Sequence, residues 1–384
     1  MPRLTKEDEL YWLALRLVPG LGVRRAGQLL DAYHGPQAIF RASRSELEAA
    51  GISGSVAQSV ASGCSFDDAA AMQQKMLDAG AVLITRSDER YPPRLGEIYD
   101  PPLVLFARGR VEILSEPMIG VVGTRRPTTY GTAVAERIAG DLARSGLVIS
   151  SGMARGIDTA AHKGALEAGG DTVAVFGCGV DVLYPTENRK LASHLAEKGL
   201  LLSEFPMGSP AYPQNFPVRN RIISGMSLGI LVVEGAQYSG SSITARLALD
   251  QGREVFAVPG NVTSKVSWGP NLLIKQGAKL VQDYNDVVVE LAPEVRRRLV
   301  EKSRARLGVE ASEAPVQGEL PLGPSNDTAR AVLDLLRVDQ AIHLDAVLEK
   351  LERCSASELI AVLFELEMLG LVKQLPGKNF VKVW

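Results

Sequence analysis

The stretch "MIGVVGTRRPTTYG" (residues 118–131) joins an apolar run to a glycine-containing loop that carries two arginines. A segment of helical length follows it directly. Further short apolar runs alternate with helix-length segments as far as Gln282: "GLVIS", "TVAVFG", "LLSE", "LGILVVE" and "EVFAVPG". This alternation predicts a doubly wound α/β domain with a mainly parallel sheet. The loops that end the runs should gather at the carboxyl edge of that sheet, where such folds bind their ligands.

Composition limits the classes of protein that fit. The chain has 384 residues, 46% of them apolar, which is enough for two or three domains. The net charge of −2 argues against a surface coated in positive charge, but it allows a local basic site. We expect a soluble, cytoplasmic protein without a membrane span, because no leader or long apolar run is present. Three widely spaced cysteines and four histidines predict neither disulfides nor a metal site.

The two ends of the chain differ from its centre. Residues 1–80 predict a small all-α domain, in which "PGLGVRRAGQLL" (residues 19–30) resembles a helix–hairpin–helix element, although a turn that only packs fits equally well. The α/β domain is then expected over 81–292, a linker over 293–326 and a last domain over 327–384.

The last domain has a winged-helix pattern of three helices and a short hairpin. Ser355 or Ser357 is expected to cap the third helix. That helix carries glutamates, including Glu358, Glu365 and Glu367, where a DNA-reading helix usually carries basic residues. A protein contact or a packing role is therefore at least as consistent with it as a DNA contact.

The first two edge loops are suited to an anion. In the first, Gly123 and Thr124 precede Arg125, which offers a bidentate fork to a phosphate. The fingerprint G-x-G-x-x-G is absent and no acidic residue ends the second strand, so no dinucleotide cofactor is expected.

The second loop, "SSGMARGIDTAAH" (residues 150–162), holds Ser151, Gly152, Arg155 and Gly156. The glycines allow a tight turn, and Asp158 or Thr159 is expected to cap the helix that follows. His162 lies in that helix, where a packed histidine is the more common case than a catalytic base.

Two further loops combine charge with aromatic rings. Arg189 and Lys190 follow Tyr184 in the first, and Arg219, Asn220 and Arg221 follow Phe216 in the second. This combination suits a single strand of nucleic acid, because phosphates attract charge and exposed bases stack on flat rings. Alternatively the loops form a solvated rim, with Arg221 paired to Glu204 or Glu234.

Taken in order, these motifs resemble the DNA-processing protein A (DprA or Smf) family, most densely from about residue 120 to 281. The resemblance implies a Rossmann-like central domain that forms a homodimer and binds single-stranded DNA without sequence preference. It also implies that the protein protects incoming DNA in natural transformation and loads the RecA recombinase. The predicted DNA-binding residues are Gly123, Thr124, Arg125, Ser151, Gly152, Arg155, Gly156, Arg189, Lys190, Arg219, Asn220 and Arg221.

The rival interpretation is an enzyme on the same fold, a nucleotide phosphoribohydrolase. That class places a glutamate shortly after a glycine-rich turn, whereas the corresponding stretch here is "EGAQYSGSSITA" (residues 234–245), with no glutamate after its Gly-Ser turn. We therefore predict a protein that is not an enzyme and has no catalytic residues.

Overall fold

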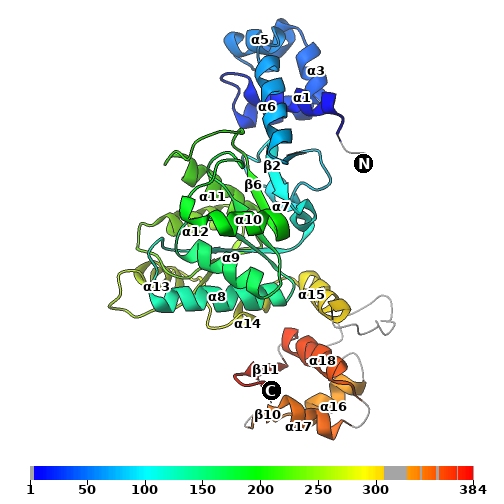
Figure 1. The fold of residues 1–384 in the computed structure, drawn as a ribbon, viewed down its shortest axis with the longest axis vertical. Helices are drawn as coiled ribbons and strands as arrows, with labels where there is room; N and C mark the ends of the chain where they lie inside the picture. The colour runs from blue at the N-terminus through cyan, green and yellow to red at the C-terminus, as the bar shows by residue number, and fades with distance from the viewer. Residues whose placement is uncertain (1–3, 307–326, 338–339, 352–353, 370, 384) are drawn as a thin grey trace. The chain divides into compact units, whose positions relative to one another are not determined.

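The fold is described from a computed structural model (Figure 1). It describes residues 4–306, 327–337, 340–351, 354–369 and 371–383. The chain forms two compact units, Met1–Leu280 and Val281–Trp384.

The first unit begins with helices rather than strands, as the sequence predicts. A capping box starts the first helix, because the Thr5 side chain accepts from the Asp8 backbone and the Asp8 side chain accepts from the Thr5 backbone. The helices are α1 (Lys6–Leu17), α2 (Val23–Tyr33), α3 (Pro36–Arg41), α4 (Arg44–Ala49), α5 (Gly54–Ala61) and α6 (Phe66–Asp78). Their buried side chains, such as Trp12 and Leu29, belong to one core cluster with Phe176 and Leu201 of the α/β part. The helical segment is therefore packed onto the α/β part.

The α/β part is built on a nine-stranded sheet with the order β1-β2-β6-β5-β4-β3-β7-β8-β9. In this order, the seven strands from β6 to β9, which include β3, β4 and β5, are parallel to one another, whereas β1 and β2 form an antiparallel edge. The strands are β1 (Val82–Thr85), β2 (Val104–Gly109), β3 (Met118–Val122), β4 (Val148–Ser151), β5 (Thr172–Val175), β6 (Leu200–Ser203), β7 (Gly229–Val232), β8 (Glu254–Ala257) and β9 (Lys279–Leu280). The mainly parallel, doubly wound sheet predicted from the alternating pattern is confirmed, whereas β1, β2 and β9 lie outside that pattern.

Helices cover both faces of this sheet. Successive residues of β5 point to opposite faces, so that Ala174 belongs to the core cluster containing α10 while Val173 belongs to the cluster containing α11 and α12. In Figure 1, α8 and α9 run alongside each other below α10. The remaining elements of the unit are α7 (Pro93–Gly96), η1 (Val111–Ser115), α8 (Thr129–Arg144), α9 (Ile157–Glu167), η2 (Thr186–Asn188), α10 (Arg189–Lys198), α11 (Asn215–Met226), α12 (Gly240–Asp250) and α13 (Trp268–Lys275).

The strand order reverses at β3, the first strand of the parallel set. β3 pairs with β4 on one side and with β7 on the other, although β7 comes much later in the chain. The loops that follow β3, β4 and β7 therefore lie close together at the carboxyl edge of the sheet. A reversal of this kind is where open α/β sheets bind ligands.

The second unit is a winged helix with two additional helices before it. Its elements are α14 (Asn285–Val288), α15 (Pro293–Arg306), α16 (Asp327–Leu335), β10 (Ile342–His343), α17 (Leu344–Lys350), α18 (Ala356–Met368), β11 (Val372–Leu375) and β12 (Asn379–Lys382). The cap of α18 is Ser355, in a capping box with Glu358.

The linker expected over 293–326 lies only partly within the described residues. Its first part is α15, which packs on α18 within the winged-helix unit, and 307–326 lie outside the described residues. Among the residues that the structure describes, no helix combines the length and the apolar character that a membrane span requires.

Candidate nucleic-acid interface

An arginine–aromatic cluster lies at the carboxyl edge of the sheet. The Arg125 guanidinium carbon is 5.3 Å from the centre of the Phe216 ring, and the Tyr184 and Phe216 ring centres are 5.5 Å apart. Arg125 and Tyr184 are both exposed to solvent, and the exposed fraction of Tyr184 is 42%. Two loops and the first turn of α11 thus bring one cation and two rings together, a combination that suits a single strand of nucleic acid. We refer to Arg125, Tyr184 and Phe216 as the arginine–aromatic cluster.

Arg219 packs near Phe216 of this cluster, on the side of the protein interior. Its guanidinium carbon is 5.9 Å from the Phe216 ring centre, but the side chain is buried and donates a 2.6 Å hydrogen bond to the Val175 carbonyl. Gly152 leaves the space that this arginine fills, since a Cβ atom there would lie 1.9 Å from Arg219 Nη1. Arg219 is one of the residues predicted to bind DNA, but the structure places it beneath the surface.

The carboxylate of Asp158 occupies the loop after β4. It accepts from the backbone N–H groups of Gly152 and Ala154, the latter at 3.2 Å. Burial raises the pKa of Asp158, whereas the positive charge of Arg219 opposes that rise. The helix cap predicted at Asp158 or Thr159 is wrong: α9 begins after Gly156 with no side-chain cap, and Asp158 turns back onto the preceding loop. The amide of Gly152, one of the predicted DNA-binding residues, is therefore used within the protein.

A second carboxylate closes the first edge loop. Glu234, which follows β7, accepts from the Thr128 backbone at 2.9 Å and from its hydroxyl at 2.6 Å, at the start of α8. The Thr124 amide, another predicted phosphate ligand, donates to the Glu234 carbonyl at 2.6 Å. The positive end of α8 is thus satisfied by the protein itself. Neither carboxylate is predicted from the sequence as a residue that holds these loops in place. For Glu234 a sequence signal exists, because an acidic residue directly follows an apolar strand.

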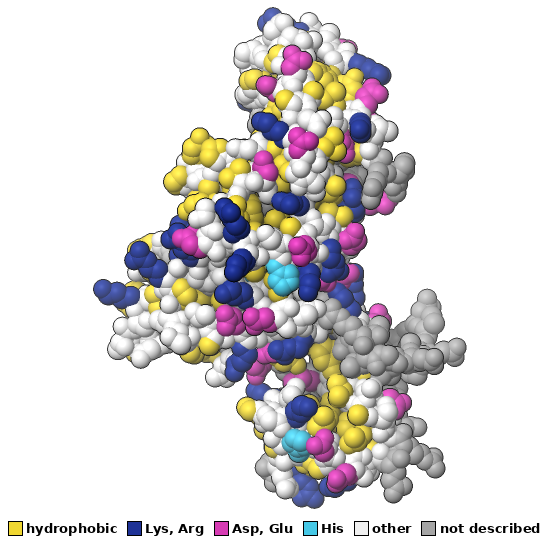
Figure 2. All heavy atoms as spheres, viewed as in Figure 1, with side chains coloured by type: hydrophobic (Ala, Val, Ile, Leu, Met, Phe, Trp, Pro, Cys, Tyr) yellow, Lys and Arg dark blue, Asp and Glu magenta, His cyan; other side chains and the backbone are white. Residues whose placement is uncertain are grey.

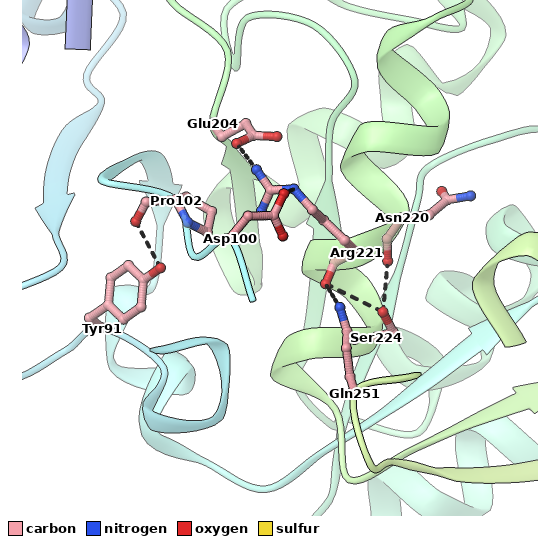
Figure 3. Close-up of polar contacts among 8 residues, drawn as sticks. All are labelled: Tyr91, Asp100, Pro102, Glu204, Asn220, Arg221, Ser224 and Gln251. Atoms are coloured by element: carbon pink, nitrogen blue, oxygen red, sulfur yellow. Dashed lines mark hydrogen bonds and ion pairs between the residues drawn. The ribbon is translucent and has the colours of Figure 1, made fainter. Parts of the chain in front are cut away.

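Arg221 lies in a buried ion network (Figure 3). Its Nη2 is 2.5 Å from Glu204 Oε2, and its Nε is 3.2 Å from Asp100 Oδ2. The side chains of Arg221 and Glu204 are 9% and 4% exposed. The predicted role of Arg221 as a DNA-binding residue does not fit this burial, whereas the alternative pairing with Glu204 is what the structure contains.

The other predicted residues divide by exposure. Arg155, Arg189 and Lys190 are exposed, and Arg155 forms an ion pair with Glu187. Arg189 also lines a cavity of about 430 Å³ beside α10. On the face drawn in Figure 2, Lys and Arg side chains gather over the middle of the first unit. The remaining predicted residues are partly or fully buried: Gly123, Ser151, Gly156 and Asn220.

Ser151 and Asn220 contact the protein rather than solvent. The Ser151 hydroxyl donates to the Val121 carbonyl at 2.6 Å, and Asn220 Nδ2 is 3.5 Å from the Gly240 carbonyl. Gly156, with a φ of +80°, allows the loop to turn where a Cβ atom would lie 2.3 Å from the Thr124 carbonyl. These residues help to fix the conformation of the segments around the arginine–aromatic cluster.

His162 is part of the core. It is fully buried, its Nδ1 is 2.6 Å from the Thr172 hydroxyl, and that hydroxyl donates to the Ile149 carbonyl. Nδ1 therefore carries the proton, and burial lowers the pKa of His162 to about 3. A histidine held neutral away from solvent is unsuited to act as a general base on a bound nucleotide. Within the described part of the chain, no group of three or more His, Cys, Asp or Glu side chains is arranged to hold a metal ion.

Comparison with known proteins decides the family. The sequence model of the DNA recombination-mediator protein A family matches residues 82–292, more than half of the chain. The chain belongs to this family. The model of the DprA winged helix domain also matches, over residues 317–378.

Individual members of the DNA recombination-mediator protein A family are similar over long segments. DNA processing protein DprA of Bacillus subtilis is 47% identical over 215 residues, which cover 56% of this chain and 72% of that protein. Protein Smf of Escherichia coli is 39% identical over 298 residues, covering 77% and 76%. Protein Smf of Synechocystis is 30% identical over 98% of this chain and 99% of that protein.

Solved structures agree with the fold. That of DNA processing protein A from Streptococcus pneumoniae has a TM-score of 0.66 and 35% identity, and covers 74% of this chain and 98% of that one. A structure of DNA processing protein A from Helicobacter pylori, which describes that protein's single-stranded DNA binding mode, has a TM-score of 0.50 and 30% identity. It covers 54% of this chain and 93% of that one.

Proposed function

We propose that this protein binds single-stranded DNA without sequence preference, protects it and loads the RecA recombinase onto it during natural transformation and recombination. The arginine–aromatic cluster is the observation that carries the proposal. An exposed guanidinium beside two rings gives one charge for a phosphate and an apolar surface for an unpaired base. Membership of the DNA recombination-mediator protein A family supports the same function.

The proposed DNA surface contains the exposed members of the predicted set together with Tyr184. Arg125 and Tyr184 provide its centre, and Arg155, Arg189 and Lys190 add positive charge around it. The buried residues Ser151, Gly152, Arg219 and Asn220 form its support. Arg221 is placed in neither group, because it is buried and its charge is compensated by Glu204 and Asp100.

The proposed activity is binding, not catalysis, and no cofactor is invoked. The histidine of the second edge loop is buried and neutral, and the acid after β7 is held by Thr128. We expect the protein to act as a cytoplasmic homodimer formed through the Rossmann-like domain, with single-stranded DNA and RecA as its partners.

A titration of single-stranded against double-stranded DNA at two salt concentrations tests the binding mode. Affinity for the single strand should be the higher of the two and should fall steeply with salt, with a log–log slope of about −0.7 for each phosphate neutralised. A flat salt response, or a preference for the duplex, would contradict the proposal. Loading is tested separately, by measuring RecA assembly on the same strand with and without the protein.

A further inference from the structure

The helix that supports the arginine–aromatic cluster is anchored by a network of contacts around Arg221. α11 carries Phe216 and Arg219 in its first turns and Arg221 two residues later. The Arg221 guanidinium joins Glu204, at the end of β6, to Asp100, in the segment before β2. Its backbone carbonyl accepts from Gln251 Nε2 at 3.2 Å. Figure 3 shows these contacts converging on Arg221 from several segments.

The N-terminal helices reach the same network at two points. The Arg24 guanidinium of α2 lies 4.1 Å from the ring centre of Tyr99, which directly precedes Asp100. Arg16 of α1 is half-buried, and burial lowers its pKa while the negative charge of Glu204 opposes the change. Arg24 thus contacts the residue next to Asp100, and the charge of Arg16 interacts with that of Glu204.

The arrangement has a mechanical consequence. Arg221 pairs through Nη2 with the buried carboxylate of Glu204 and through Nε with the half-exposed carboxylate of Asp100. These pairs restrain the rotation of the helix that carries Arg221, because shifting the helix would leave the charges of Arg221 and Glu204 buried and unpaired. Phe216 and Arg219 lie on the same rigid helix, so their positions under Arg125 depend on that rotation.

We propose that Arg221 is a positioning residue, which sets the orientation of α11 for DNA binding and couples the arginine–aromatic cluster to the N-terminal helical domain through Glu204 and Asp100. The orientation of α11 is a property of the free protein. Only the effect on DNA rests on the proposed function.

Hydrogen exchange of the full chain without DNA tests the orientation directly. Arg221→Met should speed exchange in the first turns of α11 and in the loop over 205–214. The matched control is Arg253→Met, since Arg253 is equally buried and paired to Glu97 but donates to the Gly225 carbonyl at the far end of α11. Arg24→Ala should affect the same segment as Arg221→Met, but less. Unchanged protection in Arg221→Met, or equal loosening of this segment in the control, would overturn the proposal.

Binding of single-stranded DNA tests the coupling to the site. Arg221→Met should weaken binding about tenfold, within the range of coupling between neighbouring groups. The salt slope should stay that of the wild type, because a buried arginine neutralises no phosphate. In a chain that already carries Phe216→Ala, Arg221→Met should reduce the affinity for single-stranded DNA less than it does in the wild type, because both substitutions act through the Phe216 ring. Arg221→Lys should retain more of the affinity than Arg221→Met.

The outcomes separate the two proposals. Full additivity with Phe216→Ala, or a reduced salt slope in Arg221→Met, would refute positioning in favour of an independent or direct contact. If the wild type binds no single-stranded DNA, the proposed function fails, and the exchange experiment alone still decides whether Arg221 positions α11.

Discussion

Arg125 is the residue on which the proposed interface depends most. It is exposed at the carboxyl edge of the sheet, whereas Arg219 and Arg221 are buried. Arg125→Ala should weaken binding of single-stranded DNA by about 1–3 kcal/mol through loss of a charge-assisted contact. The log–log salt dependence of binding should also become weaker, by about 0.7 in the magnitude of its slope. Fluorescence anisotropy at several salt concentrations measures both quantities.

The control for Arg125→Ala is Lys198→Ala. Lys198 is also exposed, but it lies at the end of α10, at the opposite edge of the sheet. Its removal should leave the affinity and the slope unchanged. Equal losses in the two variants would show a diffuse charge effect instead of a contact at the cluster.

His162 should make stability depend on pH. Its pKa is about 3 in the folded protein against an ordinary 6.5, so the unfolded chain binds a proton more readily. The free energy of unfolding should therefore decrease as the pH falls below 6.5, by about 2 kcal/mol from this group between pH 7 and pH 5. Urea unfolding of the wild type and of His162→Gln at both pH values measures this difference. A loss of equal size in the variant would assign the pH dependence to other groups.

At the scale of elements, α8 and α9 pack closely against each other through a glycine. Gly164 of α9 faces the α8 backbone, and a Cβ atom there would lie 2.1 Å from the Glu136 carbonyl. Gly164→Ala should therefore lower the free energy of unfolding by about 1–3 kcal/mol, because backbone cannot yield as a flexible side chain does. Lys163→Ala, at the exposed neighbouring position, should change it by less than about 0.5 kcal/mol. Thermal unfolding of both variants provides the comparison, and equal stability would remove the steric argument.

The elements also show why the winged helix is more than its three helices and hairpin. The Tyr284 hydroxyl donates to Glu367 of α18 at 2.7 Å, and Arg296 of α15 is 3.5 Å from the Met368 carbonyl. Burial raises the pKa of Glu367, while the bond from Tyr284 opposes the rise. The acidic end of α18 is thus used for packing within its own unit, one of the two roles that its glutamates suggested.

For the whole molecule, these contacts predict where the chain can be divided. A chain that ends at Leu280 should stay folded, because the first unit is complete there, and it should keep its affinity for single-stranded DNA within about threefold. A chain that ends at residue 327 retains α14 and α15 without α18, which exposes Leu299, fully buried in the intact protein. That chain should bind a hydrophobic dye and self-associate in gel filtration. Identical behaviour of the two truncations would contradict the unit boundary at 280.

Local patterns were sufficient for much of the fold. The alternation of apolar runs and helix-length segments predicted the parallel strands, and the serines before the third helix predicted a cap at Ser355 or Ser357, of which the structure has Ser355. Both signals act over a few residues. The antiparallel strand β2 also contains an apolar run. However, no helix-length segment separates it from the next strand, β3, so it does not belong to the alternating pattern. Its place at the edge depends on pairing with β6, a distant segment.

The sequence by itself determined the fold class, the edge loops and the residue types that gather there, since periodicity and loop chemistry are local properties. Only the tertiary structure decided which arginines face solvent. Arg125 and Arg221 look alike in the sequence, yet Arg221 meets Glu204 and Asp100, whereas Arg125 lies beside an aromatic ring at the surface. The physical reason is that a charge is buried where opposite charges or hydrogen-bond acceptors from distant segments compensate it, and the fold alone brings those segments together.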